Sequence, residues 1–152
     1  ITGHADEPIG ALLVTLIGAI NIPIADTLLG TSDVYVTFRC AKVTKKSSIA
    51  YGACSPSWPD CKFEWYKIKQ HSTMLKLEIY DYDKFSRDDL LATLDIPVKD
   101  IAHAPMGDVT KTYEVHVLPG FTNARPDPDA PSKITLRTQW VPFKRLYQKR
   151  NK

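Results

Sequence analysis

Hydrophobic and polar side chains alternate along most of this chain, a pattern typical of half-buried β-strands. The alternation is clearest from Met74 to Tyr80, where one face is apolar and the other is mixed. The predicted strands are eight in number and cover residues 12–17, 34–40, 46–51, 62–68, 74–80, 91–98, 111–117 and 133–140. Turn-forming residues separate them, most clearly at positions 30–33, 55–59 and 125–129. Short strands at this spacing predict an all-β fold, an antiparallel β-sandwich.

Helical patterning is confined to a turn at Val98–Ala102 and the basic segment 143–152. A length of 152 residues fits one domain, and 43% hydrophobic with 24% charged residues excludes wholesale disorder. The longest apolar run, residues 11–19, is too short to cross a bilayer. We expect an N-terminal extension over residues 1–9, a folded domain over 10–142 and a basic tail or linker over 143–152. Because the first residue is not methionine, we expect a domain of a longer protein.

Composition excludes several classes of protein. Three cysteines, Cys40, Cys54 and Cys61, are too few for a disulfide-rich scaffold; their odd number fits free thiols, with a Cys54–Cys61 bridge left open. The four histidines have no zinc-like spacing, and a net charge of +3 is too small to indicate nucleic-acid binding. Neither a glycine-rich phosphate loop nor a nucleophile elbow occurs, so we expect a non-catalytic chain.

Aspartates cluster where two loops are predicted. Asp81 and Asp83 are two residues apart at a strand end, which directs both carboxylates to one side, and Asp89 follows six residues later. Asp26 and Asp33 flank an earlier loop. If both loops lie at one end of the sandwich, the carboxylates converge, and each pair at ~4 Å repels by about 1–4 kcal/mol. A hard cation that takes oxygen ligands, above all Ca²⁺, relieves that repulsion.

The alternative is that these aspartates are ordinary turn residues, which for any single one is the better interpretation. Five at these offsets favour the metal site. Three others are interpreted as solvated charges: Asp88, Asp95 and Asp100.

Four segments resemble the C2 domain family of calcium-dependent, lipid-binding β-sandwiches. Residues 10–19 resemble its first strand, and residues 30–36 (GTSDVYV) resemble its Gly-x-Ser-Asp-Pro-Tyr-Val segment. Residues 55–58 (SPSW) resemble its Asn-Pro-x-Trp turn, and residues 80–89 resemble its third loop, with the Asp-x-Asp…Asp spacing and an aromatic-Ser tip. One strand before the first acidic loop and a strand at the chain end are similar to the phospholipase-C-like (type II) topology.

The resemblance implies two or three calcium ions. Carried over residue by residue, their ligands are Asp26, Asp33, Asp81, Asp83 and Asp89, with lesser candidates in the backbone carbonyls of Ala25 and Tyr82 and the hydroxyl of Ser86. Three positions depart from the family: Asp26 and Asp33 are one residue further apart than is commonest, Val34 replaces proline, and Ala92 replaces a frequent glycine.

Apolar residues at the loop tips indicate membrane contact. Leu28 and Leu29 lie at the first tip and Phe85 at the third, where full burial of each is worth about 1.5–3 kcal/mol. Lys84 and Arg87 flank Phe85, and a basic group near an anionic leaflet contributes roughly 1 kcal/mol. We therefore expect a peripheral, cytoplasmic protein on anionic phospholipid, with an extracellular one not excluded. The alternative for Leu28 or Leu29 is packing onto the core.

Tyr35, Lys46 and Tyr80 match the family's phosphoinositide site on its concave sheet, although Thr37 stands where lysine is common. A solvated hairpin is the simpler interpretation of this region. Two other functions stay open: a calcium-independent protein–protein interaction domain, and the docking domain of a lipid enzyme or pore-forming protein.

Overall fold

The computed structural model describes residues 7–25 and 30–144. The described part contains nine strands, one α-helix and one short 3₁₀ helix. Their bounds are β1 Gly10–Ile20, β2 Val34–Cys40, β3 Val43–Lys46, β4 Ser57–Ile68, β5 Met74–Asp81, β6 Asp89–Pro97, α2 Val98–Ala102, η1 Pro105–Gly107, β7 Asp108–Glu114, β8 His116–Val117 and β9 Lys133–Pro142.

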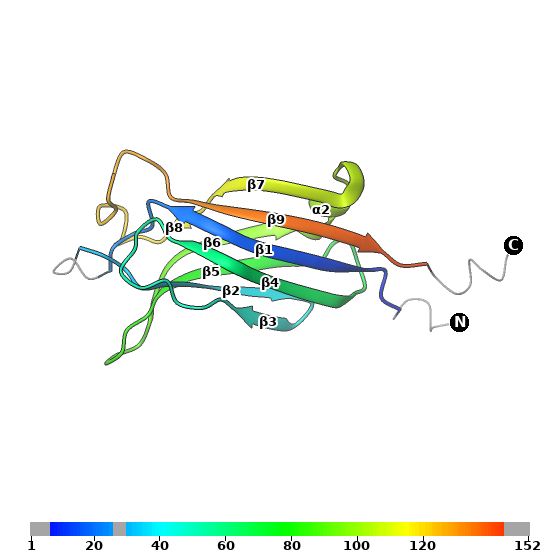
Figure 1. Cartoon of the computed structure of the whole chain (residues 1–152), viewed down its shortest axis with the longest axis horizontal. Helices are drawn as coiled ribbons and strands as arrows, with labels where there is room; N and C mark the ends of the chain where they lie inside the picture. The colour runs from blue at the N-terminus through cyan, green and yellow to red at the C-terminus, as the bar shows by residue number, and fades with distance from the viewer. Residues whose placement is uncertain (1–6, 26–29, 145–152) are drawn as a thin grey trace, which may run out of the picture.

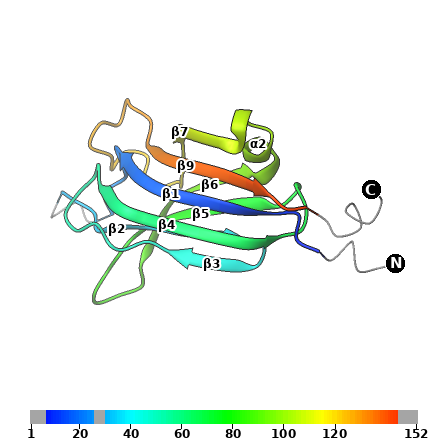
Figure 2. The ribbon, with the colours of Figure 1, turned by 45° about the vertical axis from the view of Figure 1, so that its right-hand side comes forward.

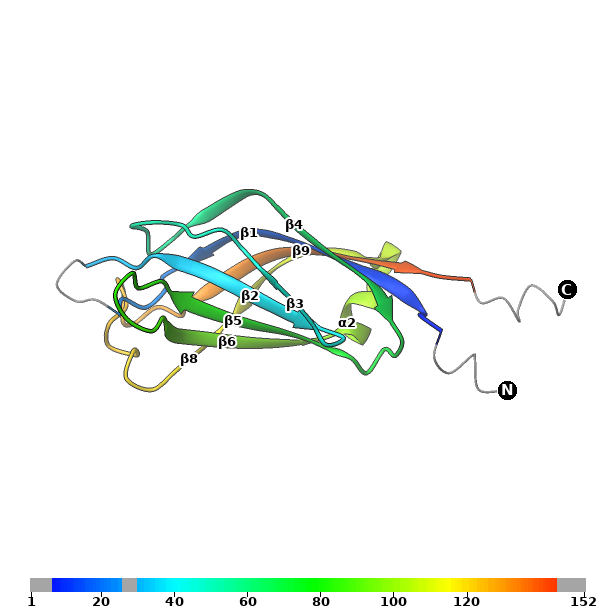
Figure 3. The same cartoon turned by 90° about the horizontal axis from the view of Figure 1, so that it is seen from below.

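The strands form two antiparallel sheets that face each other, which confirms the predicted β-sandwich (Figure 1, Figure 3). One sheet has the order β4-β1-β9-β7, and the other has the order β3-β2-β5-β6-β8. In the first sheet the long strand β1 lies between β4 and β9, and the turned view in Figure 2 shows these strands side by side. First and last strands are therefore neighbours; the type II permutation class stays a prediction.

The core fills the space between the sheets with alternate residues of each strand, as the period of two requires. Leu12, Val14 and Leu16 of β1 face inward from one sheet, together with Ile134 and Leu136 of β9. From the opposite sheet come Val34, Val36, Phe38, Leu75, Leu77 and Ile79, all at most 1% exposed. The same alternation leaves the other faces of these strands for polar and functional side chains.

Two strand predictions differ from the structure. Residues 46–51 were expected to form a strand, but β3 occupies Val43–Lys46 after a two-residue turn in which Ala41 and Lys42 both have positive φ, at 47° and 68°. That turn usually carries glycine or asparagine, so its residues did not indicate a hairpin. The predicted turn at 55–59 contains the start of β4, which begins at Ser57 and tolerates Pro59 because β4 is an edge strand.

A third difference concerns residues 111–117, expected as one strand. The chain instead changes sheets at the buried residue Val115: β7 pairs with β9 in one sheet, and β8 pairs with β6 in the other. The helical turn predicted at Val98–Ala102 is confirmed as α2, with Val98 and Ile101 buried.

Cys40, Cys54 and Cys61 are free thiols, so the bridge between Cys54 and Cys61 that the sequence left open does not form. Within residues 7–25 and 30–144, no helix has the length and apolar character needed to cross a membrane. Of the predicted tail 143–152, only residues 143 and 144 are described. The predicted domain limits stay expectations.

Candidate functional site

Three of the carboxylates singled out from the sequence lie together where β2, β5 and β6 meet the loops, at the end of the sandwich opposite the start of β1 and the end of β9 (Figure 1). Val34, the first residue of β2, is paired with Asp81, the last residue of β5, so Asp33 lies beside Asp81. Asp81 is in turn paired with Asp89, the first residue of β6. The sheet register therefore fixes the backbone positions of Asp33, Asp81 and Asp89.

Hydrogen bonds connect Asp33 and Asp81 directly. The backbone N–H of Asp33 donates to Oδ1 of Asp81 at 2.7 Å, and the N–H of Tyr82 donates back to the carbonyl of Asp33 at 2.7 Å. Oδ1 of Asp33 accepts the N–H of Gly52 at 2.8 Å. These bonds hold together three segments distant in sequence, at Asp33, at Gly52 and at residues 81–82. The Oδ2 atoms of Asp33 and Asp81 accept no hydrogen bond from a described residue.

Asp81 is electrostatically unfavourable in its ionised form. The residue is only 8% exposed, and burial raises the pKa of its carboxyl to about 6. The Asp33 N–H opposes this rise, whereas the carboxylates of Asp33, Asp89 and Asp83 add to it. Within the described part of the chain no lysine, arginine or histidine forms an ion pair with any of these four aspartates. A cation at this position would stabilise the ionised carboxylates.

Asp83 is held by its own loop instead. Its Oδ1 accepts the N–H of Phe85 at 2.9 Å and its Oδ2 accepts the hydroxyl of Ser86 at 2.8 Å. These two donors lower the pKa of the Asp83 carboxyl. The hydroxyl of Ser86 was predicted to be a lesser metal ligand. It directly contacts Asp83, one of the five main predicted ligands.

Asp88 corrects an expectation. It was interpreted as a solvated charge, but its Oδ1 accepts the backbone N–H of Asp83 at 2.9 Å and its Oδ2 accepts the hydroxyl of Tyr35. Asp88 therefore shapes the loop after β5. The sequence offered no signal for this role, because Tyr35 is 53 residues away in the chain.

A cavity of about 370 Å³ opens among these residues, lined by Thr31, Asp33, Asp81, Tyr82, Asp83, Lys84 and Phe85. Three lining residues, Asp33, Asp81 and Asp83, carry carboxylates, a ligand type that suits Ca²⁺, whereas Lys84 adds a positive charge and Asp89 does not line this cavity. Among the described residues, however, no group of three or more His, Cys, Asp or Glu side chains is arranged to hold a metal ion. Asp26 lies outside the described residues, and Ala25 is partly buried against the core. The calcium ligand set stays a prediction.

Phe85 projects from the loop after β5 and is 91% exposed. Lys84 and Arg87 beside it are exposed as well, and the Lys84 Nζ lies 5.7 Å from the centre of the Phe85 ring. Leu28 and Leu29, the other proposed membrane anchors, lie outside the described residues. An apolar ring flanked by two cations is therefore the part of the proposed membrane surface that the structure describes.

The three residues of the proposed phosphoinositide site lie together. The rings of Tyr35 and Tyr80 stack, with their centres 5.2 Å apart, and the Nζ of Lys46 lies 4.3 Å from the centre of the Tyr35 ring. The surrounding cavity of about 540 Å³ is also lined by Glu78, Arg87 and Asp88, none of which was predicted to belong to this site. Glu78 is two residues before Tyr80 on β5, so its place on the same face was readable from the alternation.

Comparison with known proteins supports the same fold. A family model described as C2 domain matches residues 10–115. Protein C2-DOMAIN ABA-RELATED 5 of Arabidopsis thaliana is 26% identical over 117 residues, which are 72% of this chain and 56% of that protein. Synaptotagmin-3 of the same plant is 28% identical over 158 residues, covering 99% of this chain and 28% of that protein. The chain thus spans 56% or less of these two relatives.

Solved structures show the likeness in three dimensions. A C2 domain of plant Extended Synaptotagmin 1 superposes with a TM-score of 0.74 at 16% identity, covering 91% of this chain and 99% of that one. The calcium-bound tandem C2 domains of Extended-Synaptotagmin 2 give a TM-score of 0.73 at 23% identity, covering 89% of this chain and 46% of that one. At these identities the likeness establishes the fold alone.

Proposed function

This chain belongs to the C2 domain family, and from that premise we propose that it binds anionic phospholipid membranes in response to calcium. It acts as a non-catalytic, membrane-targeting module of a larger protein, at the cytoplasmic face of a membrane. The observation that carries the proposal is the exposed ring of Phe85 beside a buried carboxylate, Asp81, whose ionised form lacks a cation among the described residues.

The proposed calcium ligands are the loop carboxylates. They are Asp26, Asp33, Asp81, Asp83 and Asp89, assisted by the carbonyls of Ala25 and Tyr82 and the hydroxyl of Ser86. The raised pKa of Asp81 supports this assignment, because a carboxyl that resists ionisation next to other carboxylates gains most from a bound cation. A further support is the calcium-bound structure of the related fold, which concerns that protein and not this one.

Calcium, when bound, supplies positive charge that neutralises the loop end and attracts lipid phosphate. The residues of the chain contribute the rest. Phe85 is positioned to insert, while Lys84 and Arg87 face the headgroup region, where each contributes roughly 1 kcal/mol. Without a cation the carboxylates repel an anionic surface and keep the Phe85 ring in water. Leu28 and Leu29 are proposed as further anchors.

A phosphoinositide headgroup is proposed as a secondary ligand of Tyr35, Lys46 and Tyr80. The stacked rings and the ammonium group beside them support it. The carboxylates of Glu78 and Asp88 in the same cavity oppose it, since like charges repel, whereas Arg87, which also lines the cavity, favours an anionic headgroup. We therefore expect phosphoinositide to contribute little to membrane binding compared with calcium.

The test is co-sedimentation with vesicles of phosphatidylcholine and phosphatidylserine, in calcium and in chelator. The wild-type chain should bind only in calcium, and the double variant Asp81→Asn/Asp83→Asn should bind in neither. The matched control is Asp95→Asn/Asp100→Asn, which removes two exposed carboxylates elsewhere and should behave as wild type. Equal sedimentation of the wild type in calcium and in chelator would refute the proposal and favour a calcium-independent protein-interaction domain.

A further inference from the structure

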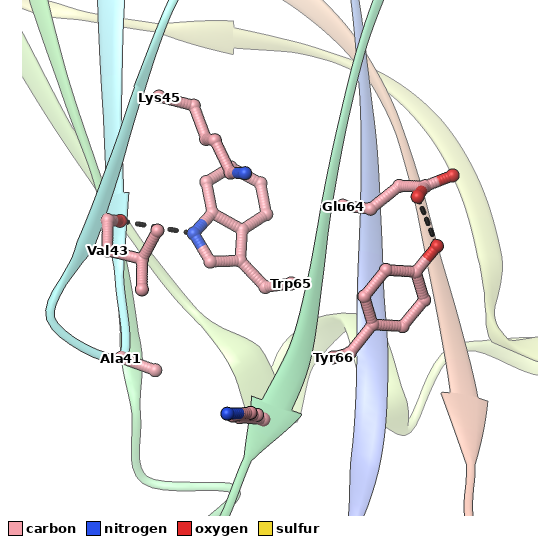
Figure 4. Close-up of a pocket in the computed structure, with 7 residues that line it drawn as sticks. Ala41, Val43, Lys45, Glu64, Trp65 and Tyr66 are labelled. Atoms are coloured by element: carbon pink, nitrogen blue, oxygen red, sulfur yellow. Dashed lines mark hydrogen bonds between the residues drawn. The ribbon is translucent and has the colours of Figure 1, made fainter.

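The sandwich is open along one side, where β3 is the edge strand of one sheet and β4 is the edge strand of the other. Two indole groups bridge this side. The Trp65 Nε1–H donates to the carbonyl of Val43 at 3.1 Å, and the Trp58 Nε1–H donates to the carbonyl of Ser48 at 3.0 Å. Figure 4 shows Trp65 reaching from β4 toward β3. The two indole hydrogen bonds therefore hold the two edge strands together.

A trough follows this opening. One cavity of about 270 Å³ is lined by residues of β3, β4 and the turn before β3, and a second of about 310 Å³ continues toward the turn after β4. The two share Ala41 and Lys67, so they adjoin. Val43, which lines the first cavity, is 46% exposed, whereas the Tyr66 ring lies on the other side of β4 from Trp65 (Figure 4). The two adjoining cavities make the trough elongated, and Val43 gives it an exposed apolar side chain.

Its charge is strongly positive. Four lysines line the two cavities: Lys42, Lys45, Lys67 and Lys69. None of them forms an ion pair or a side-chain hydrogen bond with another described residue. The one acidic residue lining the cavities, Glu64, already accepts the hydroxyl of Tyr66 (Figure 4). The lysines are thus available to an anionic ligand, and their mutual repulsion favours one.

The trough lies far from the acidic loops. Asp33 precedes β2, whereas Ala41 follows it, and a strand of seven residues at about 3.3 Å each separates the two by roughly 20 Å. Lys69 and Thr73 likewise lie at the end of β5 remote from Asp81. When the loop end faces a membrane, the trough faces the aqueous phase.

We propose that this trough, formed by β3, the C-terminal half of β4 and their four lysines, binds an extended acidic segment of a partner protein. The length of the site fits several residues of an extended chain, and its edge strands offer backbone groups of the kind that strand addition uses. Alternating side chains of such a segment match the trough, with apolar ones over the exposed side chain of Val43 and acidic ones toward the lysines. The inference does not depend on calcium or lipid binding.

The test is an NMR titration of the ¹⁵N-labelled chain with a synthetic peptide of about ten residues, the length of a long strand, in which glutamate and valine alternate. Saturable shifts are expected at Val43, Lys45 and the indole N–H of Trp65, weakening as salt is added. The same peptide with glutamine in place of glutamate is the ligand control and should shift these signals little. An absence of saturable shifts, or shifts confined to the loop end or the Tyr35 cavity, would overturn the proposal.

The variant Lys67→Glu/Lys69→Glu provides the second arm, because both side chains are exposed and their replacement leaves the core intact. It should weaken peptide binding by at least about tenfold, equivalent to about 1.4 kcal/mol. Lys111→Glu on β7, the opposite edge of the same sheet, is the matched control and should bind as wild type. Calcium-dependent vesicle binding should be unchanged in both. Unchanged peptide affinity with lost vesicle binding would make the trough a lipid surface and refute the partner segment.

Discussion

Replacing Asp81 with asparagine should stabilise the metal-free protein, although Asp81 is buried and hydrogen-bonded. The amide keeps an oxygen that can accept the Asp33 N–H, the contact that Oδ1 makes at 2.7 Å. What the substitution removes is the charge, which burial and the carboxylates of Asp33, Asp89 and Asp83 all disfavour. Its new N–H₂ group can donate to those carboxylates. Stability and metal binding should therefore change in opposite directions.

The magnitude follows from the pKa of Asp81, which rises from 3.8 to about 6. Because each pH unit is worth about 1.4 kcal/mol, the ionised carboxylate costs the folded state up to about 3 kcal/mol at neutral pH. For an acid whose pKa is raised by folding, the associated stability is fully present below pH 3.8 and is lost as the pH rises through about 6. In chelator at pH 7, the unfolding free energy of Asp81→Asn should exceed that of wild type by about 1–3 kcal/mol. Each kcal/mol should raise the melting temperature by about 2–4 °C.

Urea unfolding in chelator, at a series of pH values from 4 to 8, measures this difference. The gain of Asp81→Asn over wild type should grow between pH 4 and pH 6 and then level off. Asp95→Asn, on the exposed face of β6, removes the same charge without burial and should show no comparable gain. A variant less stable than wild type at pH 7, or a gain that is independent of pH, would show that Asp81 is not a strained carboxylate.

Two further substitutions test the membrane surface and the loop scaffold. Phe85→Ser should reduce vesicle affinity about tenfold or more, since a buried Phe contributes about 1.5–3 kcal/mol, and should leave the melting temperature unchanged because the ring is 91% exposed. An unchanged affinity would remove Phe85 from the membrane surface. Asn21→Ala should lower the unfolding free energy by about 2–4 kcal/mol, because the Asn21 Nδ2 donates to the carbonyls of Asp127 and Ala130 and its Oδ1 accepts the Asp127 N–H. Urea unfolding checks this against Asn123→Ala, an exposed neighbour whose loss should cost little.

The strands that the sequence predicted well are those with one buried face. β2, β5 and β9 each alternate between core and outer face, so the side-chain period of two was visible in the residue types. β3 was misplaced because its residues are mostly exposed and its turn uses Ala41 and Lys42 in a conformation that favours glycine. The sheet change at Val115 escaped prediction because a local pattern does not reveal which sheet a strand joins.

The residues of the candidate site likewise include some that local sequence predicted and some that it did not. Spacing alone was enough to select Asp81 and Asp83, and the register of β2 with β5 places Asp33 beside them. The role of Asp88 and the trough between β3 and β4 depend on contacts between segments distant in the chain, so no local motif indicated them. Close sequence spacing predicts residues that share a loop, but only tertiary structure reveals residues that meet across loops or sheets.

Asp88 makes the two candidate lipid-binding surfaces physically continuous. It accepts the N–H of Asp83, a proposed metal ligand, and the hydroxyl of Tyr35, whose ring stacks on Tyr80 in the second cavity. One carboxylate thus connects the loop after β5 with Tyr35, so we expect a change at either place to affect the other, because coupling between two sites is reciprocal. A loss of lipid binding in an Asp88 variant would consequently not identify one of the two surfaces as the binding site. Variants of Asp81 and Lys46, each of which belongs to one surface alone, separate them.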